Sequence, residues 1–483
     1  MTGAVTHSDV TRTETVVGRI ARLADDVRRR GLPPHLRADV ARRVLDVLGN
    51  SLAATRQPTA GTVAAVVREW GGPADATAIG TGLRLPAPSA ALLGGTLAHS
   101  LDFDDTHLPS VLHPSSPVVP AALAVAEATG APAPALLDAA GVGVEVAVRL
   151  GMGGYDRALG NSVFFERGQH ATSICGAVGA AVAAAVVRGL DADGIAHAAA
   201  IAASMGSGLL EANRTGGTVK RVHCGWAAHA GVVAADLARH GLTGPPTVVE
   251  GRFGFLQAFC GEHADVDAVV AGLGEHWELP GIFFKPYPCN HFTHAGIDAA
   301  LELRARGVDP VRIAEIELGV PGPVLRTIAQ PPEEKARPRS GYHAAFSGPY
   351  TVAAALLAGD GPEHGLGLGH ADFTDEAAAD PDRLALAAKV TCVADVRCEE
   401  IFPEQFPAVL RVRLTDGRRL EVRVDANRGG PGRPLTPEEH AAKFRLNAEP
   451  VLGSDAVRAV SDAVLAWPER GEIAPVMDLV RGA

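Results

Sequence analysis

The chain has 483 residues, which is long enough for two or three domains with a large buried core. A hydrophobic content of 47% with 20% charged residues describes an ordinary globular protein and excludes extensive disorder. The formal net charge of -11, with no Lys/Arg run longer than Arg28 to Arg30, argues against a nucleic-acid-binding surface.

Targeting signals and cysteine motifs are also missing. The N-terminus lacks the apolar core of a signal peptide, and the longest apolar run, from Gly176 to Val187, is too short to span a bilayer. We therefore expect a cytoplasmic protein with no membrane partner. The six cysteines include no C-x-x-C pair, so neither a zinc ribbon nor a disulfide scaffold is indicated. Most of them are expected to be small buried side chains.

Helical periodicity extends from Thr13 to about Val270, interrupted by Gly- and Pro-rich breaks. Abundant Ala and Gly with only 5% aromatic residues suit close helix packing better than a sandwich of aromatic-rich strands. The runs at 133–150, 171–188 and 193–208 are so apolar that we predict buried central helices there.

The stretch 97–117 gathers three carboxylates, several hydroxyls and three histidines between apolar, Ala-rich flanks. A helix over residues 96–106 would place Asp102, Asp105 and Thr106 on one face and point Asp104 elsewhere. A short loop would then return His113 to that face. A solvated polar loop is the alternative, but polar groups between apolar flanks need partners or a task.

Three further polar islands lie in apolar surroundings, at residues 164–170, 211–225 and 284–294. A single histidine is more often structural than catalytic, and Lys220 with Arg221 also fits a solvated pair. As a set, however, the islands supply imidazoles for proton transfer and cations that bind carboxylates. With the acids of the central stretch, this inventory fits proton abstraction next to a carboxylate.

Other chemistries fit less well. The sequence has no G-x-S-x-G elbow, Walker A loop or H-E-x-x-H motif. Gly206 and Gly208 lie between helical patterns and not after a strand, so a dinucleotide fold is not supported. The scattered cysteines do not suit an iron–sulfur dehydratase. Asp102, Asp105 and His113 are possible metal ligands by residue type, but we expect no metal and no other cofactor.

Near Gly281 the pattern changes from helical to mixed. Alternating residues at 312–320 and 390–393 indicate strands, and 409–414 with 420–424 form a hairpin around Asp416-Gly417. After a Gly/Pro-rich linker, Thr436 and Glu439 form a capping box that restarts a helix. We therefore predict a mainly α protein, in which residues 1–280 and 433–483 form a large helical domain and residues 281–432 an inserted α+β lid.

Four blocks in the same order resemble the MmgE/PrpD superfamily: residues 98–107 with the following His113 and Pro114, residues 218–229, residues 285–294 and residues 341–350. This superfamily includes iron–sulfur-independent 2-methylcitrate dehydratases, cis-aconitate decarboxylases and an iminodisuccinate epimerase. The resemblance implies a helical domain built from both chain ends, an inserted α+β lid and a homodimer.

The resemblance to the decarboxylase branch also implies site residues. Position by position, they fall on Asp102, Thr106, His113, His170 and Lys220. A further histidine of that branch aligns with Asn290, with His291 one place on, which is a departure from the decarboxylase pattern. Tyr350 resembles a lid tyrosine near the site.

We therefore expect a cofactor-independent lyase acting on a small di- or tricarboxylate such as 2-methylcitrate. Lys220, with Arg221 or His223, would bind a carboxylate and stabilise the enediolate-like charge. Lys285, Asn290 and Tyr350 are further candidates for substrate binding.

The expected acid–base groups are imidazoles. His113 or His170 would be the base, and a protonated His170 or His291 would be the acid. Asp102 would hold the tautomer of one histidine, and Thr106 would bond to substrate or base.

Dehydration is our first expectation, decarboxylation the second and epimerisation the third. All three share a carbanion-like intermediate, so the sequence hardly separates them. A non-catalytic binding protein is the alternative from another class. A scaffold, however, would have no need for so many titratable groups in apolar surroundings.

Overall fold

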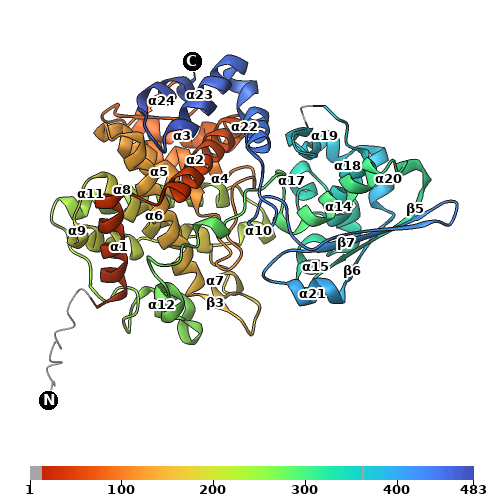
Figure 1. Cartoon of the computed structure of the whole chain (residues 1–483), viewed down its shortest axis with the longest axis horizontal. Helices are drawn as coiled ribbons and strands as arrows, with labels where there is room; N and C mark the ends of the chain where they lie inside the picture. Colours follow the sequence, from red (N-terminus) through yellow and green to blue (C-terminus); the bar gives the residue numbers. More distant parts are fainter. Residues whose placement is uncertain (1–13, 362–363, 483) are drawn as a thin grey trace.

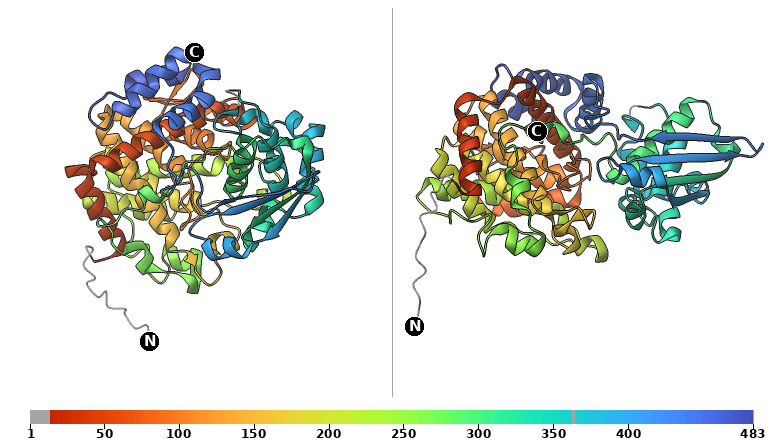
Figure 2. Two further views of the ribbon diagram at one scale, coloured as in Figure 1. Left: turned by 45° about the vertical axis from the view of Figure 1, so that its right-hand side comes forward. Right: turned by 60° about the horizontal axis from the view of Figure 1, so that its bottom comes forward.

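The computed structural model describes residues 14–361 and 364–482 (Figure 1). The predicted start of the helical pattern at Thr13 and the segment examined for a signal peptide lie outside these residues. Two hydrophobic cores are present: one combines residues 16–282 with 444–480, and the other lies within residues 287–424. We call the regions around them the helical body and the lid. Figure 2 shows that narrow connecting segments of the chain join the two. The fold-class prediction is confirmed, and the domain boundaries at 280 and 432 stay predictions.

Within residues 14–280, the longer helices of the helical body are α1 (Val16–Arg30), α2 (Pro34–Ala54), α3 (Pro58–Trp70), α4 (Ala87–His99), α5 (Ser115–Thr129), α6 (Ala133–Met152), α8 (Ala171–Val187), α9 (Ala192–Ala203) and α11 (Lys220–Arg239). Its short helices are α7 (Val163–Glu166), α10 (Ala212–Thr215), α12 (Phe255–Cys260) and α13 (Val266–Val270). Two small ribbons pair β1 (Ala76–Thr77) with β2 (Arg84–Leu85), and β3 (Tyr155–Asp156) with β4 (Asn161–Ser162).

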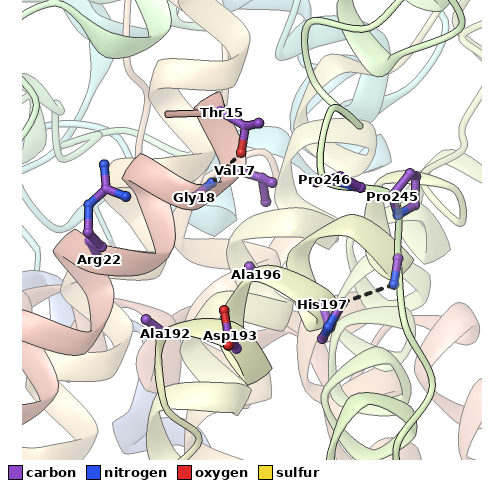
Figure 3. A pocket seen from close by; sticks show the side chains of 11 residues that line it. Thr15, Val17, Gly18, Arg22, Ala192, Asp193, Ala196, His197, Pro245 and Pro246 are labelled. Atoms are coloured by element: carbon purple, nitrogen blue, oxygen red, sulfur yellow. Dashed lines mark hydrogen bonds between the residues drawn. The ribbon is translucent and has the colours of Figure 1, made fainter. Parts of the chain in front are cut away.

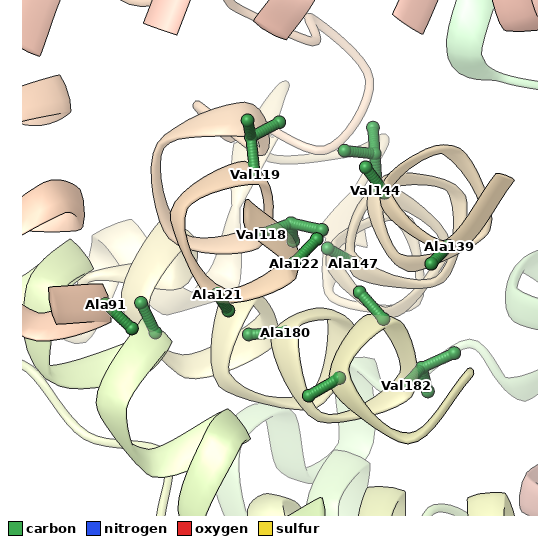
Figure 4. Close-up of a cluster of buried hydrophobic side chains, with 14 of the residues drawn as sticks. Ala91, Val118, Val119, Ala121, Ala122, Ala139, Val144, Ala147, Ala180 and Val182 are labelled. Atoms are coloured by element: carbon green, nitrogen blue, oxygen red, sulfur yellow. The ribbon is translucent and has the colours of Figure 1, made fainter. Parts of the chain in front are cut away.

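Small side chains allow the central helices to approach closely. The core between α5, α6 and α8 consists largely of Ala and Val (Figure 4). Between α4 and α11, a Cβ at Gly95 would come within 2.7 Å of Cys224 O, and a Cβ at Gly225 would overlap Leu92 O. The two glycines therefore fix the distance between α4, which ends at His99, and α11, which begins at Lys220.

Of the three predicted central helices, α6 and α8 agree with prediction. The third, α9, ends at Ala203, five residues before the predicted end.

The C-terminal segment returns to the helical body as α22 (Pro437–Leu452), α23 (Ser454–Ala466) and α24 (Ala474–Arg481). The predicted capping box is confirmed: Glu439 N–H donates to Thr436 Oγ1 at 3.2 Å, and Thr436 N–H donates to Glu439 Oε2 at 2.8 Å. In Figure 1 these blue helices lie beside α2 and α3, from the opposite end of the sequence. Gly80 N–H donates to Val480 O, which ties α24 to the turn after β1.

The lid contains a four-stranded mixed sheet in the order β6-β5-β7-β8. The strands are β5 (Ile313–Val320), β6 (Val390–Ala394), β7 (Ala408–Leu414) and β8 (Arg419–Val424). Only the β5–β6 pair is parallel, and the Asp416-Gly417 hairpin joins β7 to β8 as predicted. All four predicted strands are therefore confirmed.

Helices cover one face of this sheet, chiefly α14 (His294–Ala305) and α18 (Gly348–Leu357) (Figure 1). The other lid helices are α15 (Gly322–Ile328), α16 (Pro332–Ala336), α17 (Gly341–Ala344), α19 (Asp375–Ala378), α20 (Pro381–Ala387) and α21 (Val396–Ile401). Single 3₁₀ turns occur at Gly261–His263, Leu279–Gly281, His291–Thr293, Pro310–Arg312 and His370–Phe373.

The prediction of a helix over residues 96–106 is wrong. α4 ends at His99, and Asp102 adopts a left-handed backbone conformation with φ 53°. Asp102, Asp105 and Thr106 therefore do not share a helical face. Asp104 turns into the body, where its carboxylate accepts a hydrogen bond from His99 Nδ1. His113 does return beside Thr106, as predicted.

None of the helices in the described ranges is long and apolar enough to cross a membrane. All six cysteines are free thiols and five of them are buried, in agreement with the prediction of small buried side chains.

Candidate active site

The loop after α4 directs two aspartates to opposite sides. Asp104 is buried, and its Oδ2 accepts hydrogen bonds from His99 Nδ1 at 2.7 Å and Ser116 Oγ at 2.7 Å. Burial raises the pKa of Asp104, but the charges of His99 and His113 outweigh this effect and lower the pKa well below its ordinary value. Asp104 is therefore a carboxylate, and His99 carries its proton on Nδ1.

Asp102 faces the segment that leads from the helical body into the lid, where Lys285 lies. Lys285 Nζ donates to Asp102 O at 2.8 Å and to Oδ1 at 3.1 Å, while Oδ2 is buried without a hydrogen-bond partner. Burial raises the pKa of Asp102, but Lys285, Lys220 and His113 lower it overall. Reciprocal backbone hydrogen bonds between Thr106 and Phe283, of 2.9 and 2.8 Å, position this connecting segment beside the loop after α4.

The hydrogen bonds of His113 define its tautomer. Nδ1 lies 2.6 Å from Asp105 O, which can only accept, so Nδ1 carries a proton and the free lone pair of the neutral ring is on Nε2. Thr106 Oγ1 lies 3.4 Å from the same Nδ1. Burial lowers the pKa of His113 to about 4, opposed by Asp104 and assisted by Lys285. At neutral pH, His113 is therefore a neutral imidazole.

His170 and His223 face each other where α8 and α11 begin. Their Nδ1 atoms are 3.1 Å apart, so one ring donates and the other accepts. Burial and then the charge of His99 lower both pKa values, that of His170 well below the ordinary value and that of His223 to about 4. The lowered pKa values favour neutral rings, and the contact itself requires only that one of the two Nδ1 atoms keeps its lone pair.

His291 lies in the 3₁₀ turn at the lid entrance. It is buried, and neither ring nitrogen has a hydrogen-bond partner. Burial, Lys285 and His113 lower its pKa well below the ordinary value. Asn290 has a different task, because its Oδ1 accepts from Phe292 N–H at 3.1 Å and caps the turn.

Lys220 and Arg221, at the start of α11, lie beside Tyr342, and Lys220 is also close enough to Asp102 to lower the pKa of that carboxyl group. The ammonium of Lys220 makes no hydrogen bond or ion pair with residues 14–361 or 364–482. Burial lowers its pKa, but Tyr342, Asp102 and Asp104 outweigh burial and raise it. The Arg221 guanidinium lies over the Tyr342 ring, 5.6 Å from its centroid. Both cations retain donors for a bound anion.

The structure thus brings together most of the predicted site residues: Asp102, Thr106, His113, His170, Lys220, Arg221, His223, Lys285 and His291. Tyr350 lies apart from them in the lid core. Its hydroxyl donates a hydrogen bond to Asp372 O at 2.7 Å and accepts one from Arg383 Nη1 at 3.0 Å. The roles of all these residues stay predictions.

Asp105 has a structural environment. Its carboxylate accepts from Arg43 Nη1 at 3.1 Å and Ser115 Oγ at 2.5 Å, and Arg43 also donates to the carbonyls of Leu279 and Ile282. Burial raises the pKa of Asp105 to about 6. Within the described ranges, no three His, Cys, Asp or Glu side chains form a possible metal site.

A small pocket elsewhere shares no residue with this cluster. It lies between α1, α9 and residues 244–246 (Figure 3) and has a volume of about 40 Å³, room for only one or two waters. A polycarboxylate does not fit there.

The sequence-based reasoning missed His99, Asp104 and Tyr342. His99 and Asp104 belong to the block used for the resemblance, and their close spacing was a possible signal. Nothing in the local sequence distinguishes Tyr342 from Tyr350, since both belong to the block 341–350.

Residues 18–266 match the MmgE/PrpD N-terminal domain, and residues 287–469 match the MmgE/PrpD C-terminal domain. The chain belongs to the MmgE/PrpD family.

Its curated relatives share 26–30% identity over most of both chains. The cis-aconitate decarboxylase of Homo sapiens is 30% identical over 83% of this chain and 80% of its own length. That of Aspergillus terreus is 26% identical over 90% of both chains. The cis-aconitate decarboxylase-like protein oryM of Aspergillus oryzae is 27% identical over 93% of this chain and 95% of its own length.

Proposed function

We propose that the protein is a lyase that decarboxylates a small unsaturated polycarboxylate of the cis-aconitate type. The observation that carries the proposal is the buried cluster in which Lys220 and Lys285 surround Asp102 beside several neutral imidazoles. The relatives named as cis-aconitate decarboxylases favour decarboxylation over dehydration, which was the first expectation from sequence.

The reaction places clear demands on such a site. When a carboxylate leaves from the carbon next to a C=C bond as carbon dioxide, the electron pair of the broken bond forms a new C=C bond. The old π pair moves to the far carbon, where a neighbouring carboxylate stabilises the charge until a proton arrives. Catalysis therefore needs cations beside that carboxylate and an acid beside the carbon.

The proposed roles follow from the contacts. Lys220 and Arg221 have donors available for substrate carboxylates, while Lys285 is held by Asp102 and adds positive charge. His113, with Nδ1–H fixed on Asp105 O, presents Nε2 for proton transfer. A polyanionic substrate raises the pKa of a neighbouring imidazole, so His113 would gain its proton as the substrate binds.

The departure at Asn290 does not remove an imidazole from this region. Asn290 caps a turn, and the next residue, His291, is buried with both ring nitrogens unpartnered. We propose that His291 contacts the substrate in place of the histidine of the decarboxylase branch. The predicted homodimer and the absence of a cofactor belong to the same proposal.

The test is incubation of chelator-treated protein with cis-aconitate, 2-methylcitrate or citrate in deuterated water, followed by proton NMR. We expect cis-aconitate to yield itaconate with one deuterium on carbon. A tricarboxylate alkene formed from 2-methylcitrate would instead indicate dehydration, and deuterium exchange without net conversion would indicate epimerisation. Either of these results without carbon dioxide release would overturn the proposal, as would no reaction with any of the three acids.

A further inference from the structure

Four imidazoles lie in one continuous row. The ring centroids of His113 and His99 are 5.5 Å apart, those of His99 and His170 are 5.2 Å apart, and those of His170 and His223 are 5.2 Å apart. The rings come from four separate segments: the loop before α5, the end of α4, the start of α8 and the first turn of α11.

The centre of the row is built around a histidine that the proposed function does not use. His99 is 4% exposed and donates from Nδ1 to Asp104, so its Nε2 holds the lone pair. This Nε2 is buried without a hydrogen-bond partner, as is Asp104 Oδ1, which lies 3.9 Å from His113 Nδ1. A carboxylate that holds Nδ1–H stabilises the imidazolium formed when Nε2 takes up a proton.

Gly208 packs against the His170–His223 pair, which forms the end of the row farthest from His113. A Cβ at Gly208 would come within 3.1 Å of His170 Cβ and 3.3 Å of His223 Nδ1. His170 N–H donates to Gly208 O at 3.0 Å. His223 is half-buried, whereas His170 and His99 are buried, so His223 is the member of this end that meets solvent.

Decarboxylation consumes one proton in each turnover, because a neutral carbon–hydrogen bond replaces a carboxylate. His113 is only partly buried, but a substrate bound against its Nε2 would shield the ring from direct reprotonation by water. We propose that His223, His170, His99 and His113 form a proton-conducting row, centred on Asp104, that resupplies the proton consumed in each turnover. The inference rests on the proposed function and adds to it the route of the proton.

Protonated His113 gives the proton on Nε2 to the far carbon as the carbon–carboxylate bond breaks, and the ring is left neutral. A proton then moves to it from the His99 imidazolium, directly or through water, and Asp104 keeps the Nδ1 proton of His99 in place. His170 and then His223 replace the proton of His99, and His223 takes one from hydronium or a buffer acid.

The charges around the row favour this direction of transfer. Lys220 and Lys285 disfavour a resting proton on the rings, and both contribute to the low pKa values of the row, Lys220 at His170 and His223 and Lys285 at His113. Asp104 opposes them at His113. A polyanionic substrate cancels the cations, so protons enter the row when substrate is bound.

The decisive variant is His223→Gln. An amide can still hydrogen-bond to His170 Nδ1, so a positioning role survives, but it cannot take up a proton. We expect kcat to fall at least about tenfold, with a larger solvent isotope effect and little change in KM. His223→Ala should be restored severalfold by imidazole in the buffer. The matched control is His240→Gln, at the exposed end of the same helix, which should leave kcat unchanged.

Thermal unfolding of each variant checks that it is folded. Wild-type kcat and isotope effect in folded His223→Gln would overturn the row, and so would a His223→Ala defect that imidazole fails to relieve. If the wild type releases no carbon dioxide, the proposed function fails separately, and the row is then judged by deuterium exchange into the substrate. Slower exchange in His223→Gln would support it, and equal exchange, or no exchange in the wild type, would overturn it.

Discussion

The charged groups of the helical body and those of the lid sheet are organised in opposite ways. In the body and at the entrance to the lid, His99, Asp102 and His291 are enclosed, and each has a buried nitrogen or oxygen atom without a partner. On the open face of the lid sheet, the charged groups are paired. Arg411 alone donates to Glu317, Asp395 and Glu421, each at 2.8 Å.

The difference distinguishes a site from a scaffold. An unpartnered buried polar atom costs about 1–3 kcal/mol, so folding alone gives no reason to keep several of them together. Exposed ion pairs cost little and contribute little. The enclosed cluster thus costs folding stability, as expected of a region that binds a charged ligand, whereas the charges on the open face of the lid sheet are paired with one another.

The largest expected effect follows from removing the cation of the body that has no internal partner. Lys220→Ala should lower kcat/KM by about 10²–10³-fold, the usual consequence of losing one preorganised charge at developing negative charge. The melting temperature should change little, because the ammonium makes no hydrogen bond or ion pair within residues 14–361 and 364–482. Steady-state kinetics and thermal unfolding measure the two quantities.

Lys389→Ala is the matched control in the lid. Its ammonium donates to Ile313 O at 2.7 Å, so its loss removes a structural contact and leaves the site intact. We expect a lower melting temperature with wild-type kcat. For Lys220→Ala, a folded variant with near-normal turnover would remove Lys220 from the mechanism.

A smaller effect is expected at His440, whose burial should change the pH dependence of the unfolding free energy and not turnover. This ring packs edge-on against Phe284, and burial with the charges of Arg42, Lys443 and Arg43 lowers its pKa to about 3. The unfolded chain, with an ordinary His pKa near 6.5, therefore binds one more proton between these pH values. The stability contributed by neutral His440 is fully present above about pH 6.5 and is lost as the pH falls toward 3.

His440→Phe should remove this dependence. At pH 5.5 the slope of unfolding free energy against pH should fall by about 1.2 kcal/mol per pH unit, as measured by denaturant titrations at several pH values. Asp105, whose pKa is raised to about 6, contributes with the opposite sign in both proteins and cancels in the difference. An unchanged slope would show that His440 is protonated or exposed in the folded protein.

Local sequence predicted the elements whose signals are local. The Asp416-Gly417 hairpin and the capping box at Thr436 depend on turn and cap chemistry within a few residues, and both occur as predicted. The buried helices α6 and α8 follow from composition alone. The family blocks identified most of the clustered site residues because residue identity is itself the signal there.

The loop after α4 could not be predicted because distant residues determine its conformation. Lys443, from the returning helix α22, donates to Phe103 O at 2.9 Å, and Asn50 of α2 donates to the same carbonyl at 3.3 Å. Lys285 binds the carbonyl of Asp102. These contacts hold Asp102 in the left-handed region and turn Asp104 inward, against the helical pattern of the sequence.

The smallest expected effect belongs to the open face of the sheet. Arg411 is 36% exposed, so solvent screens its three ion pairs, and Arg411→Gln should cost about 0.5–1 kcal/mol of unfolding free energy. The loss should shrink in high salt, where the wild-type pairs are already weakened, and kcat should stay at its wild-type value. Denaturant titrations at two salt concentrations measure the first effect, and turnover measures the second. A marked fall in kcat would mean that the charges of this face act on the site, and the separation between a scaffold sheet and a reactive body would then be wrong.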